Sequence, residues 1–137
     1  MVRSLTTFPV FSVEAGSNKR IQHSSSATGR CSTPRGTVIS VITEAELRFG
    51  VARLPHSVRL ALAVDEFLLR VEILPWDSAA AQKYAGLRAI FETIGEPMGN
   101  LDLMIAAQAL AIDAILVSND RVFRRIKGLR MEDWSKP

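Results

Sequence analysis

Hydrophobic and polar positions follow two different periods along this chain from residue 37 onward. Residues 37–42, TVISVI, form a short β-branched run of the kind that makes a buried strand. Helical spacing follows at once, because Leu47, Val51 and Leu54 share one face of a helix predicted to begin at Thr43. The pattern thus predicts a strand that passes directly into a helix.

The rest of the chain repeats this alternation. A second helix is predicted over residues 57–70, a strand over 71–74, a long helix capped by Asp77 and ended by Gly95, a helix capped by Asn100 that is apolar nearly all round, a strand over 115–118, a short helical turn over 120–126 and a last strand over 129–134. Strands that alternate with helices predict an α/β fold, with a parallel sheet covered on both faces.

The N-terminal 36 residues have a different character. Residues 14–36 show no helical or strand period, and we expect a loop or disorder there. Residues 5–13 have strand character, but Pro9 lacks an amide donor and is poorly tolerated in a central strand. We therefore expect an atypical, poorly ordered segment over residues 1–36 and one domain over 37–137.

Composition narrows the class of protein. With 137 residues the chain is long enough for one domain with a real core. Its single cysteine allows no internal disulfide, and no apolar run approaches the ~18 residues of a membrane helix, so we expect a cytoplasmic protein without a membrane partner. Residues 1–36 carry a net +4 and residues 37–137 a net −1. The basic character therefore says little about nucleic-acid binding by the folded part.

Three acids stand where predicted strands lead into helices: Glu46, Asp102 and Asp120. In open α/β sheets the functional crevice lies beyond the carboxyl ends of the strands. Because clustered carboxylates need a cation, we expect these three side chains to converge on one pocket and to bind Mg²⁺ or Mn²⁺. Such a site suits phosphodiester hydrolysis.

Each acid also has a purely structural interpretation. Thr43 and Glu46 have the spacing of a capping box, Asp102 lies in the first turn of a helix, where the macrodipole favours any acid, and Asp120 is placed to cap the following turn. A basic run behind Asp120 is likewise open to two interpretations, a solvated helix face or a surface that follows phosphates. Its members are Arg121, Arg124, Arg125, Lys127 and Arg130.

Several segments together resemble the PIN-domain family, and specifically the VapC toxins of bacterial toxin–antitoxin pairs. The resemblance is carried in order by residues 39–50 (ISVITEAELRFG), 71–77 (VEILPWD), 84–88 (YAGLR), 95–107 (GEPMGNLDLMIAA), 116–120 (LVSND) and 128–134 (GLRMEDW). It implies a three-layer PIN fold and a metal-dependent endoribonuclease. It also implies an RNA substrate, silencing by a VapB-type antitoxin, and a homodimer.

The family holds its metal with four acids, and Glu46, Asp102 and Asp120 resemble the second, third and fourth by position. Ser118 or Asn119 would support them as neighbouring polar groups. The first ligand of the family is an aspartate at the end of the opening, central strand, whereas residues 1–36 contain no aspartate and Glu14 is their single acid. A shifted reading frame upstream of Thr37 and a divergent natural N-terminus both account for this.

Two functions follow from the resemblance. The first is a metal-dependent endoribonuclease toxin, impaired by the loss of the first acidic ligand. The alternative is a catalytically inactive PIN-like remnant that acts as an antitoxin-binding or dimerisation module. A carboxylate at the end of the central strand would distinguish the two.

Overall fold

A computed structural model describes residues 8–13 and 36–135 of the chain. Their elements, in chain order, are β1 (Val10–Ser12), β2 (Thr37–Ser40), α1 (Val41–Arg53), α2 (Val58–Arg70), β3 (Glu72–Leu74), α3 (Ser78–Thr93), α4 (Asn100–Ala111), β4 (Ile115–Val117), the 3₁₀ helix η3 (Arg121–Arg125) and β5 (Met131–Glu132). The expectation of a loop or disorder over residues 14–36 lies outside the described residues except for Gly36.

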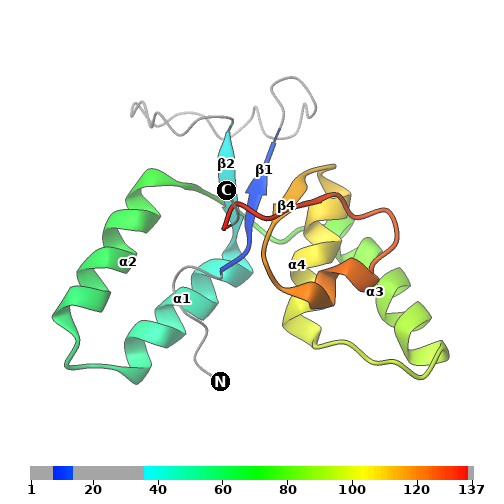
Figure 1. Ribbon diagram of the computed structural model, residues 1–137, viewed down its shortest axis with the longest axis horizontal. Coiled ribbons are helices and arrows are strands. Elements are labelled where there is room, and N and C mark those ends of the chain that lie inside the picture. The colour runs from blue at the N-terminus through cyan, green and yellow to red at the C-terminus, as the bar shows by residue number, and fades with distance from the viewer. Residues whose placement is uncertain (1–7, 14–35, 136–137) are drawn as a thin grey trace.

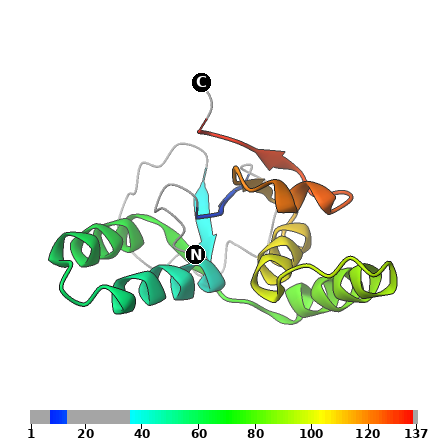
Figure 2. The same cartoon turned by 60° about the horizontal axis from the view of Figure 1, so that its bottom comes forward.

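The strands form one five-stranded sheet in the order β3-β2-β1-β4-β5. Helices α1 and α2 lie on one side of the strands and α3 and α4 on the other, as two views of the ribbon show (Figures 1 and 2). The predicted α/β fold with helices on both sides of the sheet is therefore confirmed. No helix within the described ranges combines the length and the hydropathy needed to cross a membrane.

The central strand β1 runs against the direction of the other four. It pairs antiparallel with β2, where Phe11 faces Val38, and antiparallel with β4, where Phe11 faces Leu116. The pairs β2–β3 and β4–β5 are parallel. The sheet is thus mixed. The strands predicted to be parallel, β2, β3 and β4, do run in one direction, whereas the N-terminal strand β1 is reversed, because a strand's side-chain pattern carries no information about its direction.

Pro9 does not prevent β1 from being central. The strand begins one residue later, at Val10, so the missing amide of proline is not needed in the ladder. The Pro9 carbonyl instead accepts a hydrogen bond of 3.3 Å from the buried Thr43 hydroxyl of α1. This contact ties the start of the central strand to the first helix.

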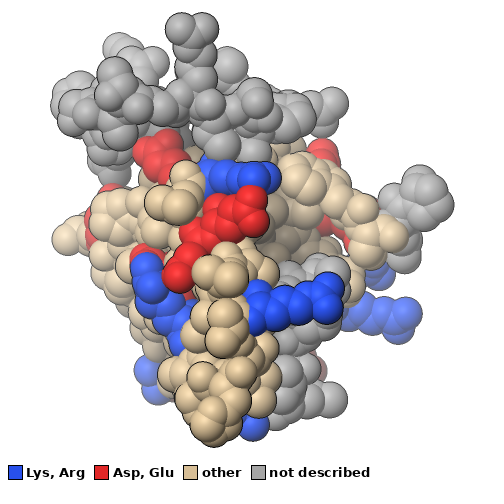
Figure 3. Space-filling model, turned by 90° about the vertical axis from the view of Figure 1, so that its left-hand side faces the viewer, with Lys and Arg blue, Asp and Glu red and all other residues tan. Residues whose placement is uncertain are grey.

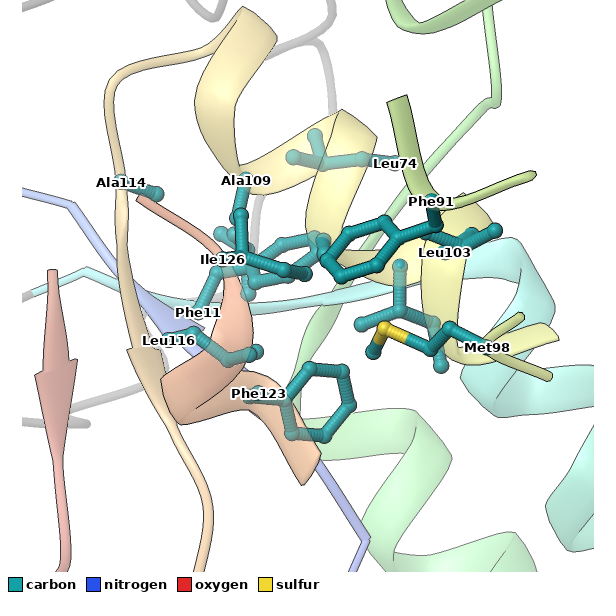
Figure 4. Close-up of a cluster of buried hydrophobic side chains, with 13 residues drawn as sticks. Phe11, Leu74, Phe91, Met98, Leu103, Ala109, Ala114, Leu116, Phe123 and Ile126 are labelled. Carbon is teal, nitrogen blue, oxygen red and sulfur yellow. The ribbon is translucent and has the colours of Figure 1, made fainter. Parts of the chain in front are cut away.

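The main core lies between the sheet and the α3–α4 side. Phe11, Leu116 and Phe123 are fully buried there and meet the apolar helix α4 (Figure 4). Side chains alternate along a strand, so the neighbours of Phe11 and Leu116, namely Val10 and Val117, point to the opposite face of the sheet. That second face is covered by the α1–α2 pair.

Candidate active site

Two of the three predicted acids line one pocket of about 630 Å³ between α1 and the start of α4. Glu46 comes from α1 and Asp102 from α4, although the two are far apart in sequence. We call this hollow the acidic pocket. Asn100, Arg53 and Phe8 also line it.

Helix α1 presents one continuous stripe to the acidic pocket. Its lining residues follow each other at helical spacing: Ile42, Ala45, Glu46, Phe49, Gly50 and Arg53. Leu47, on another face of this helix, is buried. Arg53 lies over the ring of Phe49, 5.7 Å from its centroid, and this cation–π contact favours a position of the guanidinium beside the pocket.

The capping-box interpretation of Glu46 is wrong. Helix α1 begins at Val41, and its N-cap is Ser40, whose hydroxyl accepts a hydrogen bond from the amide of Ile42. Thr43 lies inside the helix, so Glu46 is beyond the position from which it could bond back to the N-cap. One carboxylate oxygen of Glu46, Oε2, is buried.

Asp102 is held in the first turn of α4. The N-cap of this helix is Gly99 and not the predicted Asn100, and its carbonyl accepts from the amide of Leu103. A glycine is tolerated at an N-cap, and here its lack of a side chain matters. A Cβ atom on Gly99 would lie 3.3 Å from Oδ2 of Asp102, so Gly99 leaves room for that carboxylate.

Asp120 is not among the described residues that line the acidic pocket. Its carboxylate accepts a 3.0 Å hydrogen bond from the amide of Val122 and caps η3, as its structural interpretation predicts. Ser118 accepts from the amide of Asp120 at 3.1 Å. Within the described part of the chain, no three His, Cys, Asp or Glu side chains are grouped so that they could hold a metal ion. Glu46 and Asp102 thus line one pocket, and the role of the three acids as metal ligands stays a prediction.

The basic run behind Asp120 is partly engaged in holding the fold together. Arg125 donates to the carbonyl of Glu96 at 2.6 Å and lies over the ring of Phe91, 5.0 Å from its centroid. Arg130 donates to the carbonyl of Asp113 at 2.7 Å. These two arginines fix the chain after α3 and α4, which favours the structural interpretation for them.

Sequence reasoning missed Phe8, which lines the acidic pocket although it belongs to the N-terminal segment. Because β1 is reversed, its amino end lies at the edge of the sheet where β2 and β4 have their carboxyl ends. Only the strand direction places Phe8 there. Arg53, by contrast, could have been found, because it lies seven residues after Glu46 on the same helix face.

Charged side chains of both signs are mixed on the side of the molecule shown in Figure 3, the α1–α2 side. Helices α1 and α2 carry ion pairs one helical turn apart, as Arg48 forms with Glu44 at 2.7 Å and Arg70 with Glu66. This side therefore presents no broad field of one sign.

The fold agrees with comparisons to known proteins. The family model for the PIN domain matches residues 23–129, and the chain belongs to the PIN-domain family. The match begins after β1, so the central strand of this sheet lies outside it.

The relatives within this family are VapC proteins. The tRNA(fMet)-specific endonuclease VapC of Shigella flexneri is 38% identical over 98 residues, which is 71% of this chain and 74% of that protein. Ribonuclease VapC2 of Rickettsia felis is 38% identical over 99 residues, 72% of this chain and 74% of that protein.

Solved structures of toxin–antitoxin complexes are also similar. VapBC2 from Rickettsia felis, bound to a DNA fragment from its promoter, matches with a TM-score of 0.66 and 38% identity over 71% of this chain and 74% of that one. VapBC-1 from nontypeable Haemophilus influenzae matches with a TM-score of 0.67 and 32% identity over 72% and 75%.

Proposed function

We propose that this chain is a VapC-type toxin, a metal-dependent endoribonuclease that hydrolyses RNA phosphodiester bonds, with activity reduced by an incomplete set of acidic ligands. One observation carries the proposal: Glu46 and Asp102, far apart in sequence, line the same pocket. The relatives named as ribonucleases support the reaction class.

The donor set of the acidic pocket fits Mg²⁺, and Mn²⁺ as its substitute. Magnesium is commonly bound through one or two carboxylates together with phosphates of the substrate. Glu46 and Asp102 would supply those carboxylates. When bound, such a cation lowers the pKa of a water molecule and stabilises the charge that develops on the leaving oxygen.

The other residues of the acidic pocket would contact the RNA directly and need no metal ion to do so. Arg53 offers a guanidinium to a phosphate oxygen, and it lines the pocket beside the ring of Phe49. The first turn of α4 brings backbone amides and the positive end of a helix dipole to the same place. Phe8, Phe49 and Leu101 line the pocket with apolar surface.

The reversed central strand is the reason to expect weak activity. A parallel strand would end at the edge where the carboxyl ends of β2 and β4 lie, whereas β1 ends at the opposite edge. Phe8 lines the pocket in place of an acid. Each carboxylate that is lost removes a charged ligand, so the metal should bind more weakly than in a complete quartet.

The test is cleavage of a single-stranded RNA by the full chain in Mg²⁺, compared with the same reaction in EDTA. We expect slow, metal-dependent cleavage that is lost in Glu46→Gln and in Asp102→Asn. Mutation of a residue that only supports a metal ligand lowers metal affinity about 10- to 100-fold. Calorimetric titration should therefore show at least that loss when a ligand itself is replaced.

Asp65→Asn is the matched control, because Asp65 is an exposed carboxylate of α2 outside the pocket. It should leave both cleavage and titration unchanged. Asp120→Asn decides whether the third predicted acid takes part. Equal metal binding by the wild type and Asp102→Asn would remove Asp102 from the site.

We also propose a VapB-type antitoxin as partner and a homodimer as the resting state. The similar structures are VapBC complexes, and the rim of the acidic pocket suits a peptide with apolar side chains around a basic one. Phe49 is 63% exposed there and Leu101 49% exposed. Ile90 of α3 and Ile94, directly after that helix, are further exposed apolar residues that a second copy could cover.

This docking surface favours the second candidate function, an inactive module that still binds its antitoxin. Co-expression with the product of the neighbouring upstream gene should give a complex that survives purification. Phe49→Glu should abolish it by placing a charge in the apolar rim, whereas Leu69→Glu, on the exposed surface of α2, should not. A stable complex without any RNA cleavage would establish the module in place of the enzyme.

A further inference from the structure

A second pocket of about 580 Å³ lies on the face of the sheet opposite the main core. Its floor is formed by Val10 of β1, Thr37 of β2 and Val117 of β4, which point away from the core because their neighbours point into it. Phe67 of α2 and Trp134 of the C-terminal segment also line it. We call it the apolar pocket.

The apolar pocket and the acidic pocket are neighbours. Phe8 lines both of them, so one side chain stands between the two hollows. Their chemistry differs. Arg53 lines the acidic pocket, whereas the described lining of the apolar pocket contains no lysine or arginine and includes the carboxylate of Asp133. A phosphate is therefore favoured in the first and disfavoured in the second.

Two polar residues at the carboxyl end of β4 supply hydrogen-bonding groups to the apolar pocket. Asn119 lines it, and the side-chain amide of Asn119 makes no hydrogen bond within the described ranges. Ser118 is buried, and its oxygen already accepts from the amide of Asp120, so its hydroxyl hydrogen can be donated to a ligand. The pocket thus offers a donor and an acceptor side by side, plus one further donor.

We infer that the apolar pocket holds an unpaired nucleobase of the RNA substrate, next to the phosphate bound in the acidic pocket, and that Asn119 favours adenine. This inference rests on the proposed action on RNA. Unpaired bases are recognised by stacking on aromatic rings and by hydrogen bonds to their edges, and rings from three separate parts of the chain, Phe8, Phe67 and Trp134, are available. An asparagine amide matches the paired donor and acceptor of adenine.

The size and make-up of the pocket agree with a ligand of this kind. Small-molecule sites measure about 300 to 1,000 Å³ and combine mainly apolar walls with a few placed polar groups. The apolar pocket falls within that range. The part of the ligand that enters this pocket must be uncharged. A nucleobase is uncharged, whereas a phosphate carries negative charge.

The test measures binding without cleavage, in EDTA, with short single-stranded oligoribonucleotides of adenine or of uracil. We expect the wild type to bind the adenine strand about tenfold more tightly than the uracil strand. This ratio is near the lower end of the discrimination that one bidentate amide–base contact provides. Asn119→Leu should remove that preference. Trp134→Ala should weaken both strands by about tenfold, because stacking tolerates any base.

Gln82→Leu is the matched control, since it removes an exposed side-chain amide from α3 outside both pockets. It should bind as the wild type does. Because Asn119 is exposed, we expect Asn119→Leu to fold. The preference for adenine can also be tested on the wild type alone, by comparing the two strands.

Equal affinity of the wild type for the two strands would overturn the inference. So would adenosine monophosphate binding as tightly as the adenine strand, because the pocket would then serve a free nucleotide. Adenine-dependent binding without cleavage in Mg²⁺ supports this site and counts against the proposed hydrolysis. Cleavage of RNA by a protein that shows no base preference overturns the site and leaves the hydrolysis standing.

Discussion

Gly99 shows how one missing side chain can set the position of a functional carboxylate. A Cβ at this N-cap would meet Oδ2 of Asp102 at 3.3 Å, closer than ordinary van der Waals contact. The backbone of Gly99 has a φ of −54°, which any residue can adopt, so alanine would be tolerated by the chain itself. The side chain of Asp102 would have to move instead.

We therefore predict that Gly99→Ala lowers metal affinity without unfolding the protein. We expect metal affinity to fall about tenfold, which is the lower end of the effect of removing a contact that supports a metal ligand. Calorimetric titration with Mn²⁺ and a thermal melt would measure the two effects separately. Metal affinity that stays unchanged in Gly99→Ala would show that the present position of Asp102 is not the binding one.

Gly86→Ala is the matched control for that substitution. Gly86 lies inside α3, and a Cβ there would meet nothing within 4 Å. Alanine should raise the free energy of unfolding by about 0.5–1 kcal/mol, because glycine loses more backbone freedom when a helix forms. Metal binding should not change.

At the level of elements, the contact between α1 and β1 depends on one buried hydroxyl. Thr43 donates to the carbonyl of Pro9 at 3.3 Å, directly before the central strand. Thr43→Val keeps the shape and removes the donor, so we predict a loss of about 1 kcal/mol in the free energy of unfolding. Hydrogen exchange of the β1 amides should become faster.

Thr93→Val provides the comparison for Thr43→Val. The hydroxyl of Thr93 donates to the carbonyl of Ala89 at 2.7 Å, but this bond is exposed and lies within a single helix. Its loss should change the free energy of unfolding by less than about 0.5 kcal/mol. Equal effects of the two substitutions would mean that the Thr43 contact does not hold β1.

Helix boundaries were predictable where a capping side chain or a glycine marks them. Ser57 caps α2, Asp77 caps α3 by accepting from the amide of Ala80 at 3.0 Å, and Gly95 follows α3 with a φ of +72°. The start of α1 was not predictable. Ser40 caps α1 from within a β-branched run, whereas the more obvious signal, at Thr43, marks a residue that bonds to another element.

Glu46 follows the general rule for the carboxyl ends of strands, because its helix α1 comes directly after β2. Asp102 lies in α4, which follows helix α3, so its place beside Glu46 was expected from the family resemblance. Asp120 obeys the same rule in sequence, yet its carboxylate is used locally to cap η3. Local hydrogen bonds of this kind compete with a site, and sequence spacing does not decide between them. The direction of β1 was likewise outside the reach of sequence pattern.

For the whole molecule, the reversed strand suggests how the acidic set could be completed. Phe8 already lines the acidic pocket together with Glu46 and Asp102. We predict that Phe8→Asp strengthens Mg²⁺ binding and raises the rate of RNA cleavage, because it adds a charged oxygen ligand to the two present. Titration calorimetry and a cleavage assay would measure these changes.

Phe8→Asn controls for the loss of the aromatic ring. It has nearly the shape of aspartate but no charge, so it should not strengthen metal binding. Both variants remove half-buried apolar surface, and we expect each to cost roughly 1–2 kcal/mol of stability. Identical metal affinities in the two variants would show that position 8 cannot supply a ligand.

The antiparallel pairing of β1 with β2 also has a consequence for chain connectivity. Ser12 faces Thr37, and the amide of Val13 donates to the carbonyl of Gly36 at 3.4 Å, so the chain leaves and re-enters the sheet at adjacent points. A parallel pair would require a long crossover, whereas an antiparallel pair can be joined by a turn of two residues. Each halving of a flexible connection lowers its closure entropy cost by about 0.6 kcal/mol. Residues 14–35 could therefore be replaced by an Asn-Gly turn, which would convert a long-range strand pairing into a local one that forms early in folding.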